Sequence, residues 1–406
     1  MKQVSGGVCA AKGFVAAGVH CGVKASSSPD KNDLALILSE KECTAAATYT
    51  LNRVKAAPLY VTMDHLENGV AWGVVANSGN ANACCPMSHE NAQAMCLAAA
   101  QATGRAPEDF AVASTGVIGQ TINITAIQAG MPALAAKLGP EGSEDAARAI
   151  MTTDTVKKEL AFSLTLGGKE VTLGAIAKGS GMIHPNMGTM LCFITTDCAI
   201  THEMLEDALR EVVARTFNRV TVDGDTSTND MCVVLANGMA GNGLIEWKDQ
   251  DYETFLAALE ELCRQLARSI AGDGEGASKL VTCRMTGARS EESAERLAKA
   301  VVGSSLVKAA MFGSDANWGR VLCAMGYSKA PFRPEHVDVT FQSQAGSVPV
   351  CRQGDGLPFD EDAAKRILSE KEVVILVDLH EGDEAAECWG CDLTYDYVKI
   401  NGDYRT

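Results

Sequence analysis

The residues best suited to chemistry in this chain lie in one glycine-rich segment, 177–191, with the sequence AKGSGMIHPNMGTML. Lys178 brings a cation to its beginning, and Thr189 brings a hydroxyl near its end, where an apolar run typical of a buried strand begins. Gly188 precedes that hydroxyl, so the carbonyl carbon between the two residues is sterically open to attack. The spacing therefore predicts a threonine nucleophile held at the first position of a strand.

A threonine in this position can release itself from the preceding chain. Its hydroxyl attacks the carbonyl of Gly188, the peptide bond breaks, and the α-amine of Thr189 becomes a base for the same hydroxyl. A free α-amine titrates at about 7.7–8.0, which is close enough to neutral pH for general-base work. Composition alone is equally compatible with a plain glycine loop between two strands, so both interpretations stay open at this point.

Other common catalytic patterns are missing from the sequence. It contains no G-x-S-x-G, no Walker A segment and no H-E-x-x-H, and its seven histidines have no metal-ligand spacing. Cys388 and Cys391 have the C-x-x-C spacing of a redox or zinc half-site, but no second pair follows, which favours packing in the core. We therefore expect neither a metal site nor a cofactor.

Composition and charge narrow the class of protein. The 406 residues are 47% hydrophobic and 21% charged, which suits two ordinary domains or one large core. The net charge of −16 argues against a nucleic-acid partner. Most of the 15 cysteines sit in apolar runs, so we expect free thiols in reducing cytoplasm. The start lacks an apolar signal core and no run of 18 apolar residues occurs, which predicts no membrane association.

The elements that must position the segment alternate in groups. Helical spacing predicts helices over 90–102, 125–137, 143–151, 202–216, 252–271, 291–302 and 361–369, with Pro132 kinking or dividing the second. Apolar runs predict strands over 13–19, 34–38, 59–63, 70–75, 161–166, 170–176, 189–195, 337–340, 373–378 and 392–398. This grouping favours an α/β (α+β) protein of layered sheets with helices outside, rather than a doubly wound Rossmann sheet.

Further short sequence motifs occur along the whole chain, and together with the glycine-rich segment they resemble the ornithine acetyltransferase family. Members of that family are glutamate N-acetyltransferases of arginine biosynthesis, some of them with N-acetylglutamate synthase activity as well. The blocks that carry the resemblance, in the family's order, are 13–14 (GF), 77–83 (NSGNANA), 114–119 (STGVIG), 152–155 (TTDT), 178–196, 222–230 (VDGDTSTND), 272–277 (GDGEGA), 313–320 (GSDANWGR) and 395–406.

The resemblance implies a fold and a set of roles. The fold would be an αββα sandwich like that of N-terminal nucleophile hydrolases. Cleavage between Gly188 and Thr189 would divide the chain into an α part, 1–188, and a β part, 189–406, which fold together and assemble as α₂β₂. Thr189 would be the nucleophile, and Thr115 and Gly116 would form the oxyanion hole. The substrate-binding positions would be Thr155 (chosen from the run 152–155), Lys178, Thr189, Glu275, Asn401 and Thr406.

The implied reaction moves acetyl from N-acetylornithine to glutamate through an acetyl-threonine. Acetyl-CoA is a second possible acetyl donor, and these sequence blocks do not distinguish enzymes that use it from enzymes that do not. The family usually has alanine before the nucleophile, where this chain has Gly188. Glycine frees the backbone there, so we expect slower processing rather than its loss. Two alternatives stay open: an N-terminal-nucleophile aminopeptidase, which would hydrolyse instead of transferring, and an unprocessed amino-acid-binding or regulatory protein.

Overall fold

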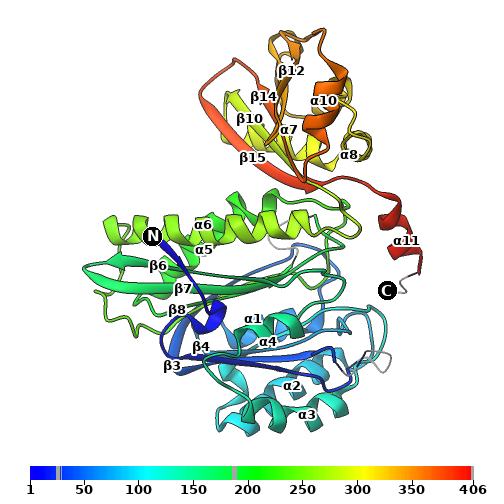
Figure 1. Ribbon diagram of the computed structural model, residues 1–406. Helices are drawn as coiled ribbons and strands as arrows, with labels where there is room; N and C mark the ends of the chain where they lie inside the picture. The colour runs from blue at the N-terminus through cyan, green and yellow to red at the C-terminus, as the bar shows by residue number, and fades with distance from the viewer. Residues whose placement is uncertain (24–27, 29, 185–189, 404–406) are drawn as a thin grey trace.

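The protein consists of a large body and a smaller lobe, seen in a computed structural model that describes residues 1–23, 28, 30–184 and 190–403 (Figure 1). Along the path of its sheet, the strands of the body are β1 (Lys2–Val4), β6 (Lys158–Leu166), β7 (Lys169–Lys178), β8 (Leu191–Thr196), β9 (Met231–Ala236), β3 (Leu34–Tyr49), β4 (Val70–Asn77) and β5 (Phe110–Ser114), with β2 (Phe14–Val19) on β3. Its helices are α1 (Ala57–His65), α2 (Ser88–Thr103), α3 (Ile124–Ala136), α4 (Ser143–Ala149), α5 (His202–Arg215) and α6 (Gln250–Gly272), with 3-10 turns at Gly7–Cys9, Pro107–Asp109 and Phe217–Arg219.

The 16-residue strand β3 serves two β layers. Its residues 34–39 pair with β2 and its residues 44–49 pair with β9, whereas β4 pairs with residues 34–38 and again with 43–44. Figure 1 shows the resulting four layers: α5 and α6, then β6 to β8, then β3 and β4, then α2 and α3. The predicted αββα class is therefore confirmed.

Each β layer is covered on both faces, so its strands are almost continuously apolar. In β4, Val74 and Ala76 face the core between the β layers, whereas Val75 faces the core under α2 and α3. This alternation is the period of two expected for a strand. The sandwich thus has a central core and two outer ones.

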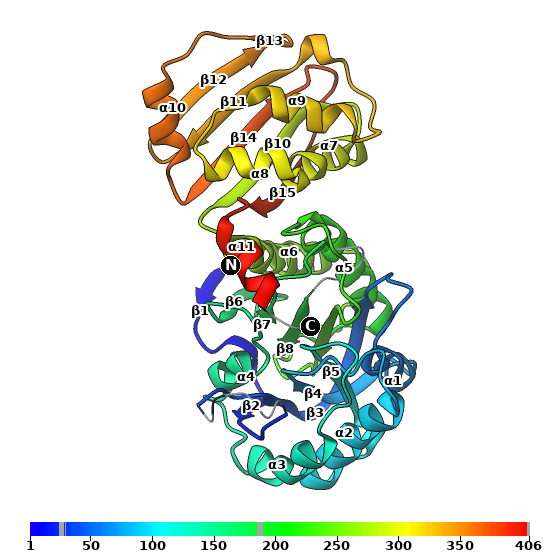
Figure 2. The same cartoon turned by 90° about the vertical axis from the view of Figure 1, so that its right-hand side faces the viewer.

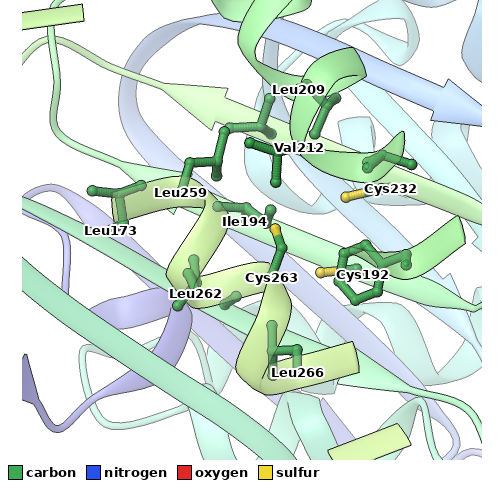
Figure 3. Close-up of a cluster of buried hydrophobic side chains, with 14 of the residues drawn as sticks. Leu173, Cys192, Ile194, Leu209, Val212, Cys232, Leu259, Leu262, Cys263 and Leu266 are labelled. Carbon is green, nitrogen blue, oxygen red and sulfur yellow. The ribbon is translucent and has the colours of Figure 1, made fainter. Parts of the chain in front are cut away.

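Figure 3 shows the outer core between the helices and the second layer. Leu259, Leu262, Cys263 and Leu266 recur at the helical spacing of three and four along α6, and they pack on the strands. Cys192 of β8 lies among them, fully buried. Burial raises the pKa of its thiol well above the ordinary value, so it packs as a small hydrophobe.

The smaller lobe has its own sheet and core. Among the described residues, its strands lie in the order β13 (Asp355–Gly356), β12 (Gly346–Arg352), β11 (Asp338–Ser343), β14 (Glu372–Asp378), β10 (Leu280–Ala288) and β15 (Glu384–Cys391). Its helices are α7 (Glu291–Gly303), α8 (Ser305–Phe312), α9 (Trp318–Gly326) and α10 (Glu361–Leu368), with a 3-10 turn at Pro334–His336. Cys388 and Cys391 are buried in β15, in agreement with the packing interpretation.

Two strand predictions are wrong. Residues 59–63 belong to α1, where Pro58 lies in the first turn, a position that tolerates proline. Residues 395–403 form helix α11 (Tyr395–Asp403), which leaves the lobe and returns to the body (Figure 2). No residue of α11 is buried, so the apolar alternation around 393–398 does not mark a sheet face. The helix predicted over 125–137 is α3, which continues through Pro132 and is not divided there.

Strands on both sides of the predicted cleavage site share the sheet of the body. Residues 173–178 of β7 pair antiparallel with 191–196 of β8, and β3 pairs with β9. Among the helices described, none combines the length and the apolar character needed to cross a bilayer.

Candidate active site

A cavity opens where the ends of β5, β7 and β8 meet, with an empty volume of about 710 Å³ including the part open to solvent. Five of the predicted site residues line it: Thr115, Gly116, Lys178, Glu275 and Asn401. Met190 and Leu191, which directly follow Thr189, line it as well. Gly188, Thr189 and Thr406 lie outside the described residues.

The loop after β5 carries Thr115 and Gly116. The Thr115 N–H donates to the carbonyl of Asn77 at 3.0 Å, and Ala81 N–H donates to Val117 O at 2.9 Å, so this loop is tied to the segment after β4. Gly116 has φ +130°, and a Cβ there would overlap the backbone of Gly79. Only glycine fits that close approach.

Lys178, the last residue of β7, is buried and fixes the Thr115 hydroxyl. Its Nζ lies 3.3 Å from Thr115 Oγ1. An ammonium only donates, so Thr115 Oγ1 accepts this bond and its own proton stays available to another acceptor. The hydroxyl of Thr115 and the N–H of Gly116 are thus a pair of donors of the kind that stabilises an oxyanion.

Asp154 provides much of the negative charge near Lys178. Burial alone would raise its pKa, but the ammonium groups of Lys178 and Lys158, together with the N–H of Gly179, hold that pKa at about 2. Lys158 Nζ lies 2.8 Å from Asp154 Oδ1 and 2.6 Å from Asp273 Oδ2. A buried network of acidic and basic side chains therefore supports the strand end that carries Lys178.

Glu275 and Asn401 meet at the opposite part of the cavity. Asn401 Nδ2, from the end of α11, donates to Glu275 Oε2 at 2.8 Å. The Glu275 N–H donates to Ser180 O at 3.0 Å, and its carboxyl packs against Gly181, where a Cβ would overlap it. Glu275 is only 8% exposed, so its carboxyl group at the cavity wall is largely shielded from solvent.

The structure does not bring Thr155 to this cavity. Its hydroxyl donates to Asp273 Oδ1 in a short hydrogen bond, and its N–H also reaches that carboxylate. Thr152 and Thr153 line the cavity in its place. The three threonines are too close in sequence for local pattern to separate them.

Four further lining residues received no individual role from the sequence, although the block VDGDTSTND contains them: Ser227, Thr228, Asn229 and Asp230. Asn229 Nδ2 donates to Ala81 O at 2.6 Å and to Ser114 O at 2.8 Å, which joins the turn before β9 to the segment after β4 and to the end of β5. Burial raises the pKa of Asp230, and its Oδ2 has no hydrogen-bond partner among the described residues. The run of consecutive polar residues in this turn-rich block is the sequence signal that points to them.

Histidine and metal chemistry have little support around the cavity. Burial, with help from the charge of Lys299, lowers the pKa of His184 to about 4, so its ring is neutral at pH 7. Its Nδ1 lies 3.0 Å from Thr221 Oγ1. Within the described ranges, no three His, Cys, Asp or Glu side chains are grouped so that they could hold a metal ion.

Comparison with known proteins gives one consistent family. The ArgJ family model matches residues 15–406. The arginine biosynthesis bifunctional protein ArgJ of Symbiobacterium thermophilum is 54% identical over 407 residues, with 100% of both chains covered, and that of Bacillus subtilis is 46% identical, covering 100% of this chain and 98% of the relative. A solved structure of the same-named Bacillus halodurans protein is 46% identical with a TM-score of 0.50, and the match covers 98% of that chain but 52% of this one.

Proposed function

Because this chain belongs to the ArgJ family, we propose that it transfers acetyl from N-acetylornithine to glutamate through an acetyl ester on Thr189. As a member of that family it is an acetyltransferase of arginine biosynthesis. The observation that carries the proposal is the cavity itself, where Thr115, Gly116, Lys178, Glu275 and Asn401 surround the strand start that follows residue 189.

The first chemical event is self-cleavage. Thr189 Oγ attacks the carbonyl carbon of Gly188, the C–N bond breaks, and the acyl group moves from nitrogen to oxygen. The hydroxyl proton passes to that nitrogen, which becomes the free α-amine of Thr189. Water then hydrolyses the ester, so residues 1–188 end in a carboxylate and the Thr189 hydroxyl is restored. The half-length match to the Bacillus halodurans chain supports this step, because residues 189–406 are a little over half of the chain.

The transfer then proceeds in two halves. Thr189 Oγ attacks the acetyl carbonyl of N-acetylornithine, the amide C–N bond breaks, and ornithine leaves with the proton that the α-amine of Thr189 took from the hydroxyl. The amine of glutamate next attacks the ester carbonyl and gives its proton to the α-amine. The α-amine passes that proton to Thr189 Oγ as the ester C–O bond breaks, and N-acetylglutamate leaves. The Thr115 hydroxyl and the Gly116 N–H stabilise the oxyanion in both halves.

The charges in the cavity suit amino-acid substrates. Glu275, aligned by Asn401, binds an ammonium group, and the Lys178 ammonium binds a carboxylate or steadies the oxyanion through Thr115. Thr153 takes the threonine contact with substrate and Thr406 a second one. The reaction needs no cofactor; acetyl-CoA would serve as an alternative acetyl donor, and the two pieces would assemble as α₂β₂.

Two measurements test the proposal. A denaturing gel together with intact-mass measurement should show the wild-type protein as two pieces divided before Thr189. Thr189→Ala should remain one chain near 42.7 kDa and should have no transfer activity. Thr189→Ser should still be cut. Ornithine release should depend on glutamate, whereas an aminopeptidase would release it in buffer alone. Cleavage of Thr189→Ala at the same bond would refute the assignment.

A further inference from the structure

The stretch that leads toward the proposed cleavage site, residues 179–184, is held to the body by hydrogen bonds along its length; we call it the approach segment. The Gly179 N–H donates to Asp154 Oδ1 at 2.8 Å, and Ser180 Oγ donates to Asp273 O at 2.7 Å. The last three residues of the approach segment, 182–184, are held by a different turn, 221–226. Residues 222–226 of that turn belong to the block VDGDTSTND.

Asp223 is the centre of this second attachment. Its Oδ2 accepts the Met182 N–H at 2.7 Å, and its Oδ1 accepts the Ile183 N–H at 2.9 Å. One carboxyl group thus accepts from two successive backbone donors. Burial raises the pKa of Asp223, and the N–H groups of Met182 and Ile183 act against that rise because they favour the carboxylate. Met182 has φ +55°, an unfavourable angle for a residue with a side chain, so its conformation needs support of this kind.

Neighbours of Asp223 extend the attachment to the end of the approach segment. The Val222 N–H donates to Ile183 O at 2.7 Å, and Thr226 Oγ1 donates to His184 O at 2.8 Å. On the far side of the proposed cleavage site, the Met231 N–H donates to Met190 O at 2.9 Å, where β8 begins. His184 and Met190 are therefore both fixed, and the Gly188–Thr189 bond lies in the five residues between them.

We propose that Asp223 is a positioning residue for self-cleavage, which fixes the incoming end of the chain so that the Gly188 carbonyl can be attacked by Thr189. The proposal rests on the cleavage proposed above. Intramolecular attack depends on a near-attack geometry, and a misplacement of about 1 Å can cost on the order of 10²-fold in rate. Thr226 supports the same geometry through His184 O.

This role separates cleavage from transfer. The hydrogen bonds of the Asp223 carboxylate to backbone go to residues 182, 183 and 225, and Asp223 is not among the residues that line the cavity. Met182 and Ile183, which Asp223 holds, do line the cavity, but the proposed transfer assigns no step to either of them. We therefore expect acetyl transfer to depend less than cleavage on how 182–184 approach residue 188. The hydroxyl of Tyr397 from α11 also reaches the Asp223 carboxylate, so this contact needs its own control.

The test is a pulse-chase of the full chain made by cell-free synthesis with labelled methionine, followed by a denaturing gel. Asp223→Asn keeps the shape of the side chain but loses its charge, and we expect it to cut on the order of 10- to 100-fold more slowly than wild type. Thr226→Val should also cut slowly, whereas Thr226→Ser, which keeps the hydroxyl, should cut at the wild-type rate. Asp225→Asn and Tyr397→Phe are the matched controls and should cut like wild type.

A second readout excludes a merely structural effect. Once cleavage is complete, acetyl transfer per cut chain should stay within about twofold of wild type for Asp223→Asn. Wild-type cutting rates in Asp223→Asn, or an equal loss of cutting and transfer, would overturn the inference while the proposed function stands. If Asp223→Asn does not fold, equal cutting by Thr226→Val and Thr226→Ser overturns it. A wild-type chain that never cuts overturns the proposed function itself.

Discussion

Gly181→Ala should displace the Glu275 carboxylate without unfolding the protein. A Cβ at position 181 would overlap the Glu275 carboxyl, and ordinary contact begins only at 3.4–4 Å, so the carboxyl must move by roughly 1 Å. The carboxyl is the far end of a flexible side chain, whereas position 181 has no positive φ that would exclude alanine. The strain is therefore relieved by moving the Glu275 carboxyl away from position 181, which disturbs its hydrogen bond with Asn401.

The expected loss follows from the contact that Glu275 makes with substrate. A hydrogen bond to a charged group contributes about 1.5–3 kcal/mol, which corresponds to a roughly 10- to 100-fold rise in KM for N-acetylornithine or glutamate. The oxyanion donors Thr115 and Gly116 stay in place, so kcat should change less. Cleavage before Thr189 should proceed normally.

The assay is steady-state transfer with both substrates varied, together with thermal unfolding. Gly243→Ala is the matched control, because its Cβ would meet nothing within 4 Å. Its KM and Tm should equal those of wild type. Unchanged KM in Gly181→Ala would refute the role of Glu275, and a fall in Tm matching the loss of activity would refute the displacement argument.

Three further predictions concern other parts of the site. Thr115→Ala should lower the transfer rate by about 10²–10³ with little change in substrate binding, and double-reciprocal plots of the wild type should be parallel; a change confined to KM would contradict the oxyanion role. Thr153→Val should raise KM at unchanged Tm, whereas Thr155→Val should lower Tm by removing the bond to Asp273, as kinetics and calorimetry can show. Between pH 6.5 and about 4 the unfolded chain protonates His184 while the folded one does not. The free energy of unfolding should therefore decrease as the pH is lowered through that window. Urea unfolding should show a weaker fall in His184→Gln.

Much of the layered fold is readable from the sequence because its strands and helices have clear periods. The apolar run of β8 matches burial on both faces of that strand, and the three-and-four spacing of α6 matches one buried helix face. Residues 59–63 and 395–398 are helical although their sequence predicts strands. Residues 59–63 form a short apolar run inside α1, and residues 395–398 alternate in apolar character on the exposed helix α11. Whether such a short segment becomes a helix or a strand depends on the element that packs against it, and that element lies far away in the sequence.

The candidate site was predictable where residues are adjacent in sequence and unusual in type. Thr115 and Gly116 form one dipeptide in a recognisable block, and Glu275 lies in another. Thr155 was chosen over Thr153 because nothing local reveals that Asp273 occupies the hydroxyl of Thr155. Asn229 contacts a loop more than a hundred residues earlier, which only the closed sandwich reveals.

The pairing of β7 with β8 gives the proposed cleavage a thermodynamic consequence. Before cleavage that ladder joins two parts of one chain; afterwards it joins two molecules, and so does the pairing of β3 with β9. Refolding then becomes a bimolecular encounter that depends on concentration, whereas the precursor refolds alone at any dilution. The cleaved protein would keep the strand pairing that formed when its precursor folded. Once denaturant separates the two pieces, dilution would hinder their reassembly.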